Sequence, residues 1–268
     1  FRGDQDIAIE DLTVGQMKDF QSYLIGEGLR MNTISLYNRE LRAVYNYALD
    51  EEIIQMDKRP FRKSFTGQEK TRKRAVDGGV VKRLAILSLI DKEMLGFARD
   101  LFLFSIYMQG MPFIDMAYLK KEQVRNGCIT YQRRKTNRQL RVKIHPQAQI
   151  IIDRYMVSDP GCPYLFPILY DPEKKTEWEY SSALRVYNKR LDSLSSLLEL
   201  DEPLTSYVAR HTWASLARQC GTSDTVISEA MGHSHVGVTT IYLASLDIGM
   251  VAMANQRVIT SLFRKRIP

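Results

Sequence analysis

The chain has 268 residues, a mass of 31.0 kDa and a formal net charge of +7, which fits one large or two small domains. Its 44% hydrophobic and 26% charged content excludes general disorder, and no apolar stretch is long enough to span a bilayer. No signal peptide opens the chain and its three cysteines form no CxxC pair, so we expect reduced thiols in a cytoplasmic protein; Phe1 in place of Met is consistent with a fragment.

Residues 1–57 predict a small helical domain, with an acidic balance of 5 basic and 11 acidic side chains. Thr13 is placed to cap a first helix that ends near Gly26, and Asn32 is placed to cap a second helix. The expected apolar stripes are Val14, Met17, Phe20 and Leu24, then Ile34, Tyr37, Leu41, Val44 and Ala48, and the polar face of the second helix carries Asn38, Arg39 and Arg42.

The segment 58–74 holds eight basic side chains and one acidic side chain, so it carries as much excess charge as the whole chain. Pro60 and Gly67 interrupt it and it lacks helical periodicity, which predicts an interdomain linker. A solvated charged linker is the plain interpretation. The sharper one is a strap across a polyanion, because each Lys or Arg at a phosphate releases counterions. The basic elements that follow favour the strap.

Residues 75–268 predict a larger, mostly helical domain with one hairpin. Asp77 is placed to cap its first helix, and Gly110 breaks a long apolar helix. The alternating pattern over 128–144 predicts a β-hairpin, and Pro146 suits the first turn of the next helix. The long apolar helix is expected over 92–108. The other expected helices cover 113–119, 181–199, 205–219, 223–231, 236–243 and 248–263.

Three short motifs stand together in the C-terminal half: ARHTWA around Arg210, GHSH at His233, and Tyr242 nine residues after that histidine. Each alone is weak, because a single Arg, His or Tyr on a helix usually has a structural explanation. In this order and spacing, and with the stretches LFLFSIYMQGMPFIDMAYLKK and LTSYVARHTWASLA, the chain resembles the tyrosine recombinase (phage integrase) family. The branch it resembles is the one on conjugative transposons and invertible DNA elements.

This resemblance implies a mostly α fold with a small β-sheet. It implies a SAM-like helical core-binding domain (1–57), a basic linker (58–74) and an α+β catalytic domain (75–268) that ends in a tail helix. The implied activity cuts and rejoins DNA through a covalent 3′-phosphotyrosine, without metal or cofactor. The implied partners are double-stranded DNA and further copies of the chain, which is a monomer when free and a tetramer on two synapsed sites. The tail helix is expected to dock on a neighbouring protomer or to pack in its own chain.

The resemblance also implies a role for each motif residue. Tyr242 would be the nucleophile, and it needs positive charge nearby because a phenol is neutral at physiological pH. Arg210 would grip the scissile phosphate with its planar fork. His233 would hydrogen-bond the same phosphate or assist proton transfer. Lys135 on the hairpin would protonate the leaving 5′-oxygen, with Arg134 as its immediate competitor.

Two positions depart from the family pattern. Gln109 stands where the family has its first clamp arginine, so transition-state stabilisation should weaken unless a cation such as Arg138 compensates. Tyr207 stands where the family has a histidine, and its hydroxyl can still bond a phosphate; for His211 we expect a buried structural role. The expected DNA-binding residues are Arg39, Arg42, Arg62, Lys63, Arg72, Lys73, Arg74, Arg133, Arg134 and Arg138.

Two other functions compete with this one. His211, His233 and His235 could suggest a hydrolytic zinc site, but no Asp, Glu or Cys stands at ligand spacing beside them. A DNA-binding relative with impaired catalysis is the second alternative, and Gln109 favours it. The joint retention of the three motifs argues against a dead relative.

Overall fold

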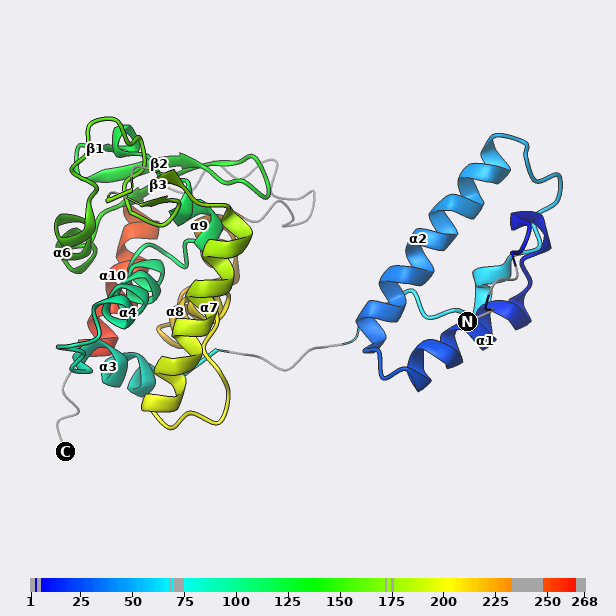
Figure 1. Cartoon of the computed structure of the whole chain (residues 1–268), viewed down its shortest axis with the longest axis horizontal. Coiled ribbons are helices and arrows are strands. Elements are labelled where there is room, and N and C mark those ends of the chain that lie inside the picture. The colour runs from blue at the N-terminus through cyan, green and yellow to red at the C-terminus, as the bar shows by residue number, and fades with distance from the viewer. Residues whose placement is uncertain are drawn as a thin grey trace. The chain divides into compact units, whose positions relative to one another are not determined.

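Residues 1–72 and 73–268 form two units in the computed structural model (Figure 1). The structure describes residues 3, 6–67, 69, 75–171, 173–174, 176–232 and 248–263. Each unit has its own hydrophobic core. The expected fold class, mostly α with a small β-sheet, is confirmed. Among the described residues, no helix is both long enough and apolar enough to cross a bilayer.

Unit 1 consists of two α-helices with short 3-10 turns beside them. The elements are η1 (Ile9–Asp11), α1 (Val14–Gly26), α2 (Met31–Asp50) and η2 (Pro60–Lys63). Thr13 caps α1 as predicted, in a capping box with Gln16: the Thr13 hydroxyl accepts from the Gln16 amide, and the Gln16 side chain accepts from the Thr13 amide. The core between the helices includes Met17, Tyr45 and Phe61.

The buried face of α2 differs from the predicted apolar stripe. Tyr37, Leu41 and Val44 are exposed, whereas Tyr45 and Asn38 are buried. Ile34 and Ala48 are buried as predicted. The stripe was wrong at the other three positions because polar side chains occupy part of the buried face, where they hydrogen-bond to backbone groups of another segment.

That segment is the first part of the predicted linker, which packs on unit 1 instead of running free. Pro60 and Phe61 are buried, and alternate residues beyond them lie along α2. The bonds join Asn38 Nδ2 to Phe65 O (3.0 Å), Ser35 Oγ to Gly67 O (2.6 Å), and the Asn32 amide to the backbone N and O of Glu69 (2.7 and 2.9 Å). Asn32 therefore anchors this segment and is not the predicted cap; α2 begins after Arg30, which makes no side-chain cap.

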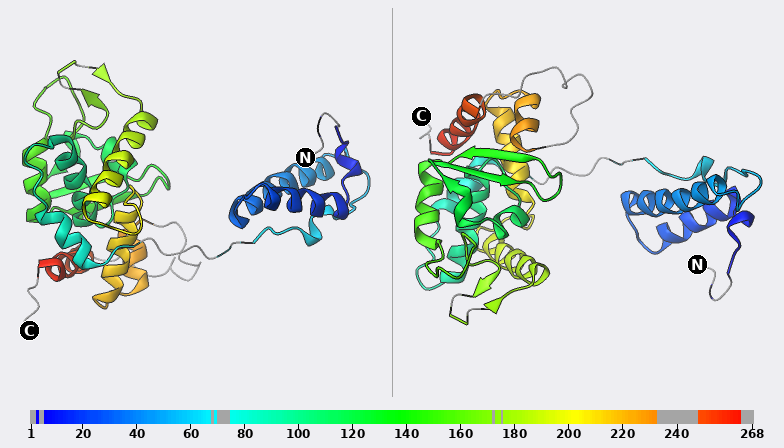
Figure 2. Two further views of the ribbon diagram at one scale, coloured as in Figure 1. Left: turned by 60° about the horizontal axis from the view of Figure 1, so that its bottom comes forward. Right: turned by 90° about the horizontal axis from the view of Figure 1, so that it is seen from above.

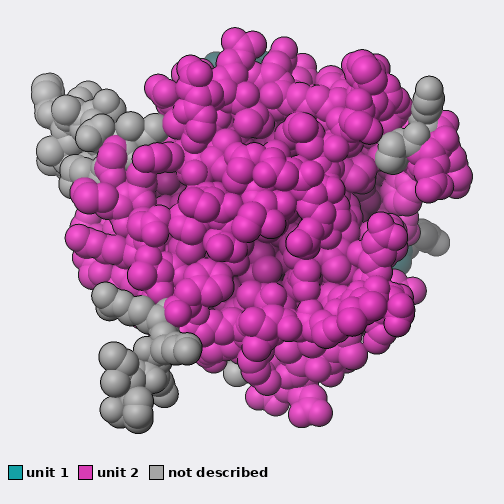
Figure 3. All heavy atoms as spheres, turned by 90° about the vertical axis from the view of Figure 1, so that its left-hand side faces the viewer, with its two compact units in different colours: residues 1–72 teal, residues 73–268 magenta. Residues whose placement is uncertain are grey.

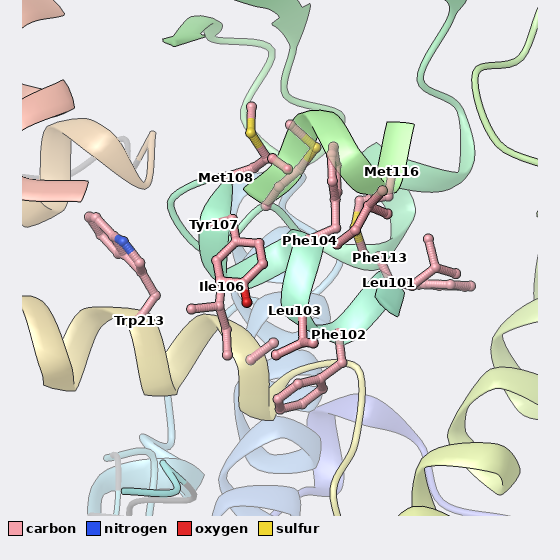
Figure 4. Packing of buried hydrophobic residues seen from close by; sticks show 14 of the residues in the cluster. Leu101, Phe102, Leu103, Phe104, Ile106, Tyr107, Met108, Phe113, Met116 and Trp213 are labelled. Carbon is pink, nitrogen blue, oxygen red and sulfur yellow. The ribbon is translucent and has the colours of Figure 1, made fainter. Parts of the chain in front are cut away.

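Unit 2 is built around α4 (Glu93–Tyr107), a helix that is apolar on nearly every side and therefore buried. Its neighbours are α3 (Gly78–Ile86), α6 (Pro146–Tyr155), α7 (Tyr180–Leu197) and α8 (Val208–Gln219). Figure 4 shows α4 side chains packed with Phe113 and Met116 of α5 (Phe113–Ala117) and with Trp213 of α8. Asp77 caps α3 as predicted and accepts bonds from the amides of Gly79 and Val80.

A three-stranded antiparallel sheet lies on one end of these helices (Figures 1 and 2). Strands β2 (Cys128–Gln132) and β3 (Gln139–Lys143) form the predicted hairpin, and β1 (Val124–Arg125) pairs with β2. A second small hairpin of β4 (Tyr170–Asp171) and β5 (Thr176–Glu177) was not predicted, because each strand has only two residues. Figure 3 shows the side chains of unit 2 closing over the core on one face. The remaining elements are η3 (Lys121–Gln123) and α9 (Asp224–Ala230).

The tail helix α10 (Ile248–Phe263) packs within its own chain, against α3, α8, α9 and β3. Val258 and Leu262 are buried, as is Asn255, whose side chain links two other elements. Asn255 Oδ1 accepts from Trp213 Nε1 (3.0 Å), and its Nδ2 donates to the carbonyl of Tyr107 (2.6 Å). Packing in cis, one of the two expected outcomes, therefore holds for the described part of the tail. The helix expected over 236–243 lies outside the described residues.

The Asn255 bridge gives a stability prediction. We expect Asn255→Ala to lower the free energy of unfolding by about 2 to 4 kcal/mol, because two buried polar groups, the Trp213 indole N–H and the Tyr107 carbonyl, lose their partner. Urea unfolding measures the loss. Met253→Ala is the matched control, since Met253 is exposed on the same helix. Equal midpoints for N255A and the native chain would show that the bridge contributes nothing.

Candidate active site

The Arg210 side chain joins two segments of unit 2. It lies in the first turn of α8 and is only 4% exposed. Its Nη1 donates to the carbonyl of Gly110 (2.8 Å) and its Nη2 donates to the carbonyl of Met231 (2.5 Å). One guanidinium therefore ties together the turn after α4 and the end of α9, two segments more than a hundred residues apart in sequence.

The turn after α4 is shaped for this close approach. Gln109 and Gly110 both have positive φ values, 61° and 70°. A Cβ atom on Gly110 would lie 3.1 Å from the Cα of Arg210, so a larger residue there would push the arginine away. Gln109 is itself buried, at 3% exposure. Gln109, which departs from the expected arginine, directly precedes the glycine whose carbonyl accepts a bond from Arg210.

Arg133, expected among the surface cations of the hairpin, is instead 6% exposed. Its Nη1 donates to the carbonyl of Gly232 (2.6 Å), which also accepts from the hydroxyl of Thr136 (3.2 Å). Its Nε is buried and has no hydrogen-bond partner among the described residues. The β2–β3 turn therefore holds the residue directly before His233.

Asp115 of α5 is the buried acid of this site. Its Oδ1 accepts from the backbone N–H of Arg134 (3.0 Å), and its Oδ2 has no partner in the described part of the chain. Burial raises the pKa of Asp115, while the Arg134 amide and the nearby Arg133 and Arg210 guanidinium groups oppose the rise. The Asp115 carboxylate thus partly balances the positive charges of Arg133 and Arg210.

The same burial acts on the groups around Asp115. It lowers the pKa of Arg210 to about 10, and repulsion by Arg133 is the second cause. It also raises the pKa of Tyr131 on β2, with the Asp115 carboxylate adding to the rise. Arg210 remains charged at neutral pH.

Two neighbours at the hairpin turn face outward. Arg134 lies over the ring of Tyr118, with its guanidinium carbon 3.7 Å from the ring centroid. Lys135 is exposed at the tip of the turn. A cavity of about 400 Å³ opens beside Arg134, and it is lined by Asp115, Tyr118, Lys120, Gln123, Tyr131, Gln132, Arg133, Arg134 and Asn137.

Tyr207 lies just before α8 and its side chain is 57% exposed. Its ring meets the ring of His211 edge to face, with centroids 4.4 Å apart. His211 is partly exposed, so the expectation of a buried histidine was wrong: its ring packs on the exposed ring of Tyr207.

The other predicted DNA-binding residues are found in different surroundings. Arg138 is paired with Glu229 of α9, and four other predicted DNA-binding residues are exposed in unit 1, where Arg42 bonds the hydroxyl of Thr66 (3.5 Å). These four are Arg39, Arg42, Arg62 and Lys63. His233, Tyr242, Arg72, Lys73 and Arg74 lie outside the described residues.

Sequence reasoning did not place Asp115, Tyr131 or Arg133 in the buried part of the site. Asp115 follows the Gln109-Gly110 turn by a few residues, and such an acid beside a predicted clamp could have been noted. Tyr131 alternates as an ordinary strand residue. Arg133 stands in a run of three cations, and sequence alone does not separate the buried one from the exposed ones.

Comparisons with known proteins bear on both units. Residues 1–65 match the model of the phage integrase SAM-like domain, and residues 82–247 match the model of the phage integrase family. No curated protein sequence matches the chain.

Several solved structures have a similar fold. A lambda integrase dimer bound to a COC′ core site is 15% identical with a TM-score of 0.65, covering 96% of this chain and 83% of that one. The Tn1549 transposon integrase in complex with circular intermediate DNA is 14% identical with a TM-score of 0.64, covering 92% and 86%. A lambda integrase tetramer bound to a Holliday junction is 16% identical with a TM-score of 0.67, covering 90% and 67%. At these identities the likeness shows the fold alone.

Proposed function

Because the chain belongs to the phage integrase family of tyrosine recombinases, we propose that it cuts and rejoins DNA at specific sites through a covalent 3′-phosphotyrosine. The observation that carries this proposal is the buried Arg210 guanidinium, which joins the Gln109-Gly110 turn to the end of α9 next to His233. A buried arginine costs free energy unless a negative charge or hydrogen-bond acceptors compensate its positive charge. The negative charge of a scissile phosphodiester would provide this compensation.

The chemistry needs one nucleophile, one clamp and one acid. The phenolic oxygen of Tyr242 attacks phosphorus and loses its proton, with His233 beside the phosphate to assist the transfer. The new P–O bond to tyrosine forms as the bond to the 5′-oxygen breaks, and that oxygen takes a proton from Lys135. Arg210 stabilises the negative charge that grows on the nonbridging oxygens. The second step reverses these bonds with a 5′-hydroxyl from another strand.

Lys135 is favoured over Arg134 as the acid. The exposed position of Lys135 at the turn tip leaves its ammonium group able to reach a substrate. Arg134 lies on the Tyr118 ring, and an arginine gives up a proton far less readily than a lysine. Tyr207, with its exposed ring, lines the site and can donate its hydroxyl to a phosphate.

Gln109 favours a second candidate, a DNA-binding relative with impaired catalysis. The buried amide brings hydrogen-bond donors but no charge to the position of the family's first clamp arginine. This candidate shares the fold and the DNA partner and differs in the rate of covalent chemistry.

The proposed partner is double-stranded DNA, and the proposed active assembly is a tetramer on two synapsed sites. The lambda and Tn1549 integrases with this fold were solved on DNA, and one lambda structure is a tetramer on a Holliday junction. The exposed cations of unit 1 and of the hairpin turn would contact phosphates.

Trapping on a nicked suicide substrate tests the proposal. A cut releases a short fragment that carries the 5′-hydroxyl, so religation stops and the protein stays attached to the 3′-phosphate. We expect an adduct that survives denaturing electrophoresis, with the DNA on Tyr242 by mass spectrometry. DNA binding without an adduct, at any incubation time, would instead establish the impaired relative.

Salt dependence tests the basic segment. Replacing Arg62 and Lys63 with Gln should weaken binding to all sequences alike and reduce the slope of log affinity against log salt by about 2, because each phosphate contact contributes about one. Fluorescence anisotropy at several salt concentrations measures this slope. The control replaces Arg185 and Lys189, two exposed cations of α7, and removes the same charge. Equal slopes for the two double variants would show that Arg62 and Lys63 do not contact DNA phosphates.

A further inference from the structure

We propose that Arg133 is the second cation of the phosphate clamp and supplies the charge that Gln109 lacks. The inference rests on the proposed function and names a residue that acts directly on the substrate. It differs from the expectation that Arg133 is one of several surface cations that hold the DNA backbone.

The first observation is a matched pair of contacts. Arg210 donates to the carbonyl of Met231 (2.5 Å) and Arg133 donates to the carbonyl of Gly232 (2.6 Å). Two arginines from different elements thus hold consecutive carbonyls, directly before His233. Arg133 holds the backbone through Nη1 alone, whereas Arg210 holds Gly110 through Nη1 and Met231 through Nη2. The N–H groups that these bonds do not use remain for an oxyanion, and Arg133 has more of them than Arg210.

The second observation is the unsatisfied hydrogen bonding of Arg133. Its Nε–H is buried and has no partner within the described residues. Buried donors are nearly always paired in folded proteins, so an unpaired one in a buried cation points to a missing acceptor. A nonbridging phosphate oxygen is an acceptor with the right charge.

The third observation is the charge balance. Arg133 and Arg210 are both nearly fully buried, and Asp115 is the buried acid that interacts with both. Repulsion between the two arginines contributes to the lowered pKa of Arg210. The cluster therefore carries one excess positive charge in a low-dielectric place. A phosphodiester carries one negative charge and would neutralise it.

The other candidates for a second clamp are committed elsewhere. Arg138, the compensating cation suggested by the sequence, is paired with Glu229. Arg134 is stacked on Tyr118. Arg133 combines burial, a neighbouring Arg210 and an unused donor. A purely structural role would be to brace Gly232, where a Cβ atom would lie 3.2 Å from Arg133 Cδ.

A neutral scissile group separates the two roles. The suicide substrate is made with a phosphodiester and, in parallel, with a methylphosphonate at the scissile position, which lacks the negative charge. We expect Arg133→Ala to slow adduct formation on the phosphodiester by about 10²- to 10³-fold. On the methylphosphonate, the native chain and R133A should differ by less than about 10-fold, since there is less charge to stabilise.

Controls keep the outcome interpretable. Arg125→Ala removes an exposed arginine of the same sheet, whose Nε also donates to a backbone carbonyl (2.9 Å), and should react like the native chain on both substrates. Arg133→Lys retains the charge, so it should keep more activity on the phosphodiester than R133A and serves if R133A does not fold. An equal loss for R133A on both substrates, or equal rates for R133K and R133A, would overturn the inference and leave a bracing role. A native chain without any adduct would overturn the proposed function itself.

Discussion

Tyr242→Phe is expected to abolish the covalent adduct on a suicide substrate while DNA affinity stays within about twofold of native. The change removes one oxygen, which is the proposed attacking atom, and keeps the ring and the net charge. Binding depends mainly on contacts between cations and phosphates, and this variant leaves them in place. Denaturing electrophoresis detects the adduct, and anisotropy on intact duplex measures affinity.

Tyr47→Phe is the matched control, because Tyr47 is an exposed tyrosine of unit 1 and should form the adduct at the native rate. An adduct that persists in Y242F would assign the nucleophile to another side chain. A loss of affinity together with the adduct would mean that Tyr242 acts in binding as well as in chemistry.

Elements with strong local signals were predicted well from the sequence. The Thr13 and Asp77 caps, the apolar helix that became α4, and the β2–β3 hairpin all form where expected. In each case the information lies within a few neighbouring residues: a cap side chain, a continuous apolar run, or an alternation around a turn.

Predictions failed where a distant segment decides the environment. Asn38 is buried because the backbone of Phe65 supplies its partner, and nothing near Asn38 in the sequence reveals that. The charge of the basic segment likewise suggested solvent, whereas the backbone carbonyls of its first part bond to α2.

The candidate site follows the same rule. Arg210 and Gln109 were proposed from their motifs, and in the structure Arg210 bonds the carbonyl of Gly110, the residue after Gln109. The burial of Arg133 could not be predicted, because it depends on Gly232, a residue 99 positions away. Sequence patterns identify the residue types at a site. Which of three adjacent cations is buried there depends on tertiary contacts.

Arg210→Lys should reduce adduct formation on the order of 10³-fold, although it preserves the charge. Arginine has enough donors to bond the carbonyls of Gly110 and Met231 and still face a phosphate, whereas the single ammonium group of lysine cannot reach all three. The two carbonyls would also lose buried donors, so we expect a lower unfolding midpoint. Adduct rates are therefore compared well below that midpoint.

Arg218→Lys, at the other end of α8, tests whether an Arg-to-Lys change matters by itself. Arg218 is exposed and pairs with Asp224 at 2.8 Å, so the lysine should replace it without loss of rate. If R210K reacted as fast as R218K, a point charge would suffice at position 210, and the clamp would depend on charge rather than on the planar fork. If R210K bound DNA normally and unfolded like the native chain but formed no adduct, the loss would lie in the transition state alone, because both the fold and ground-state binding would be intact.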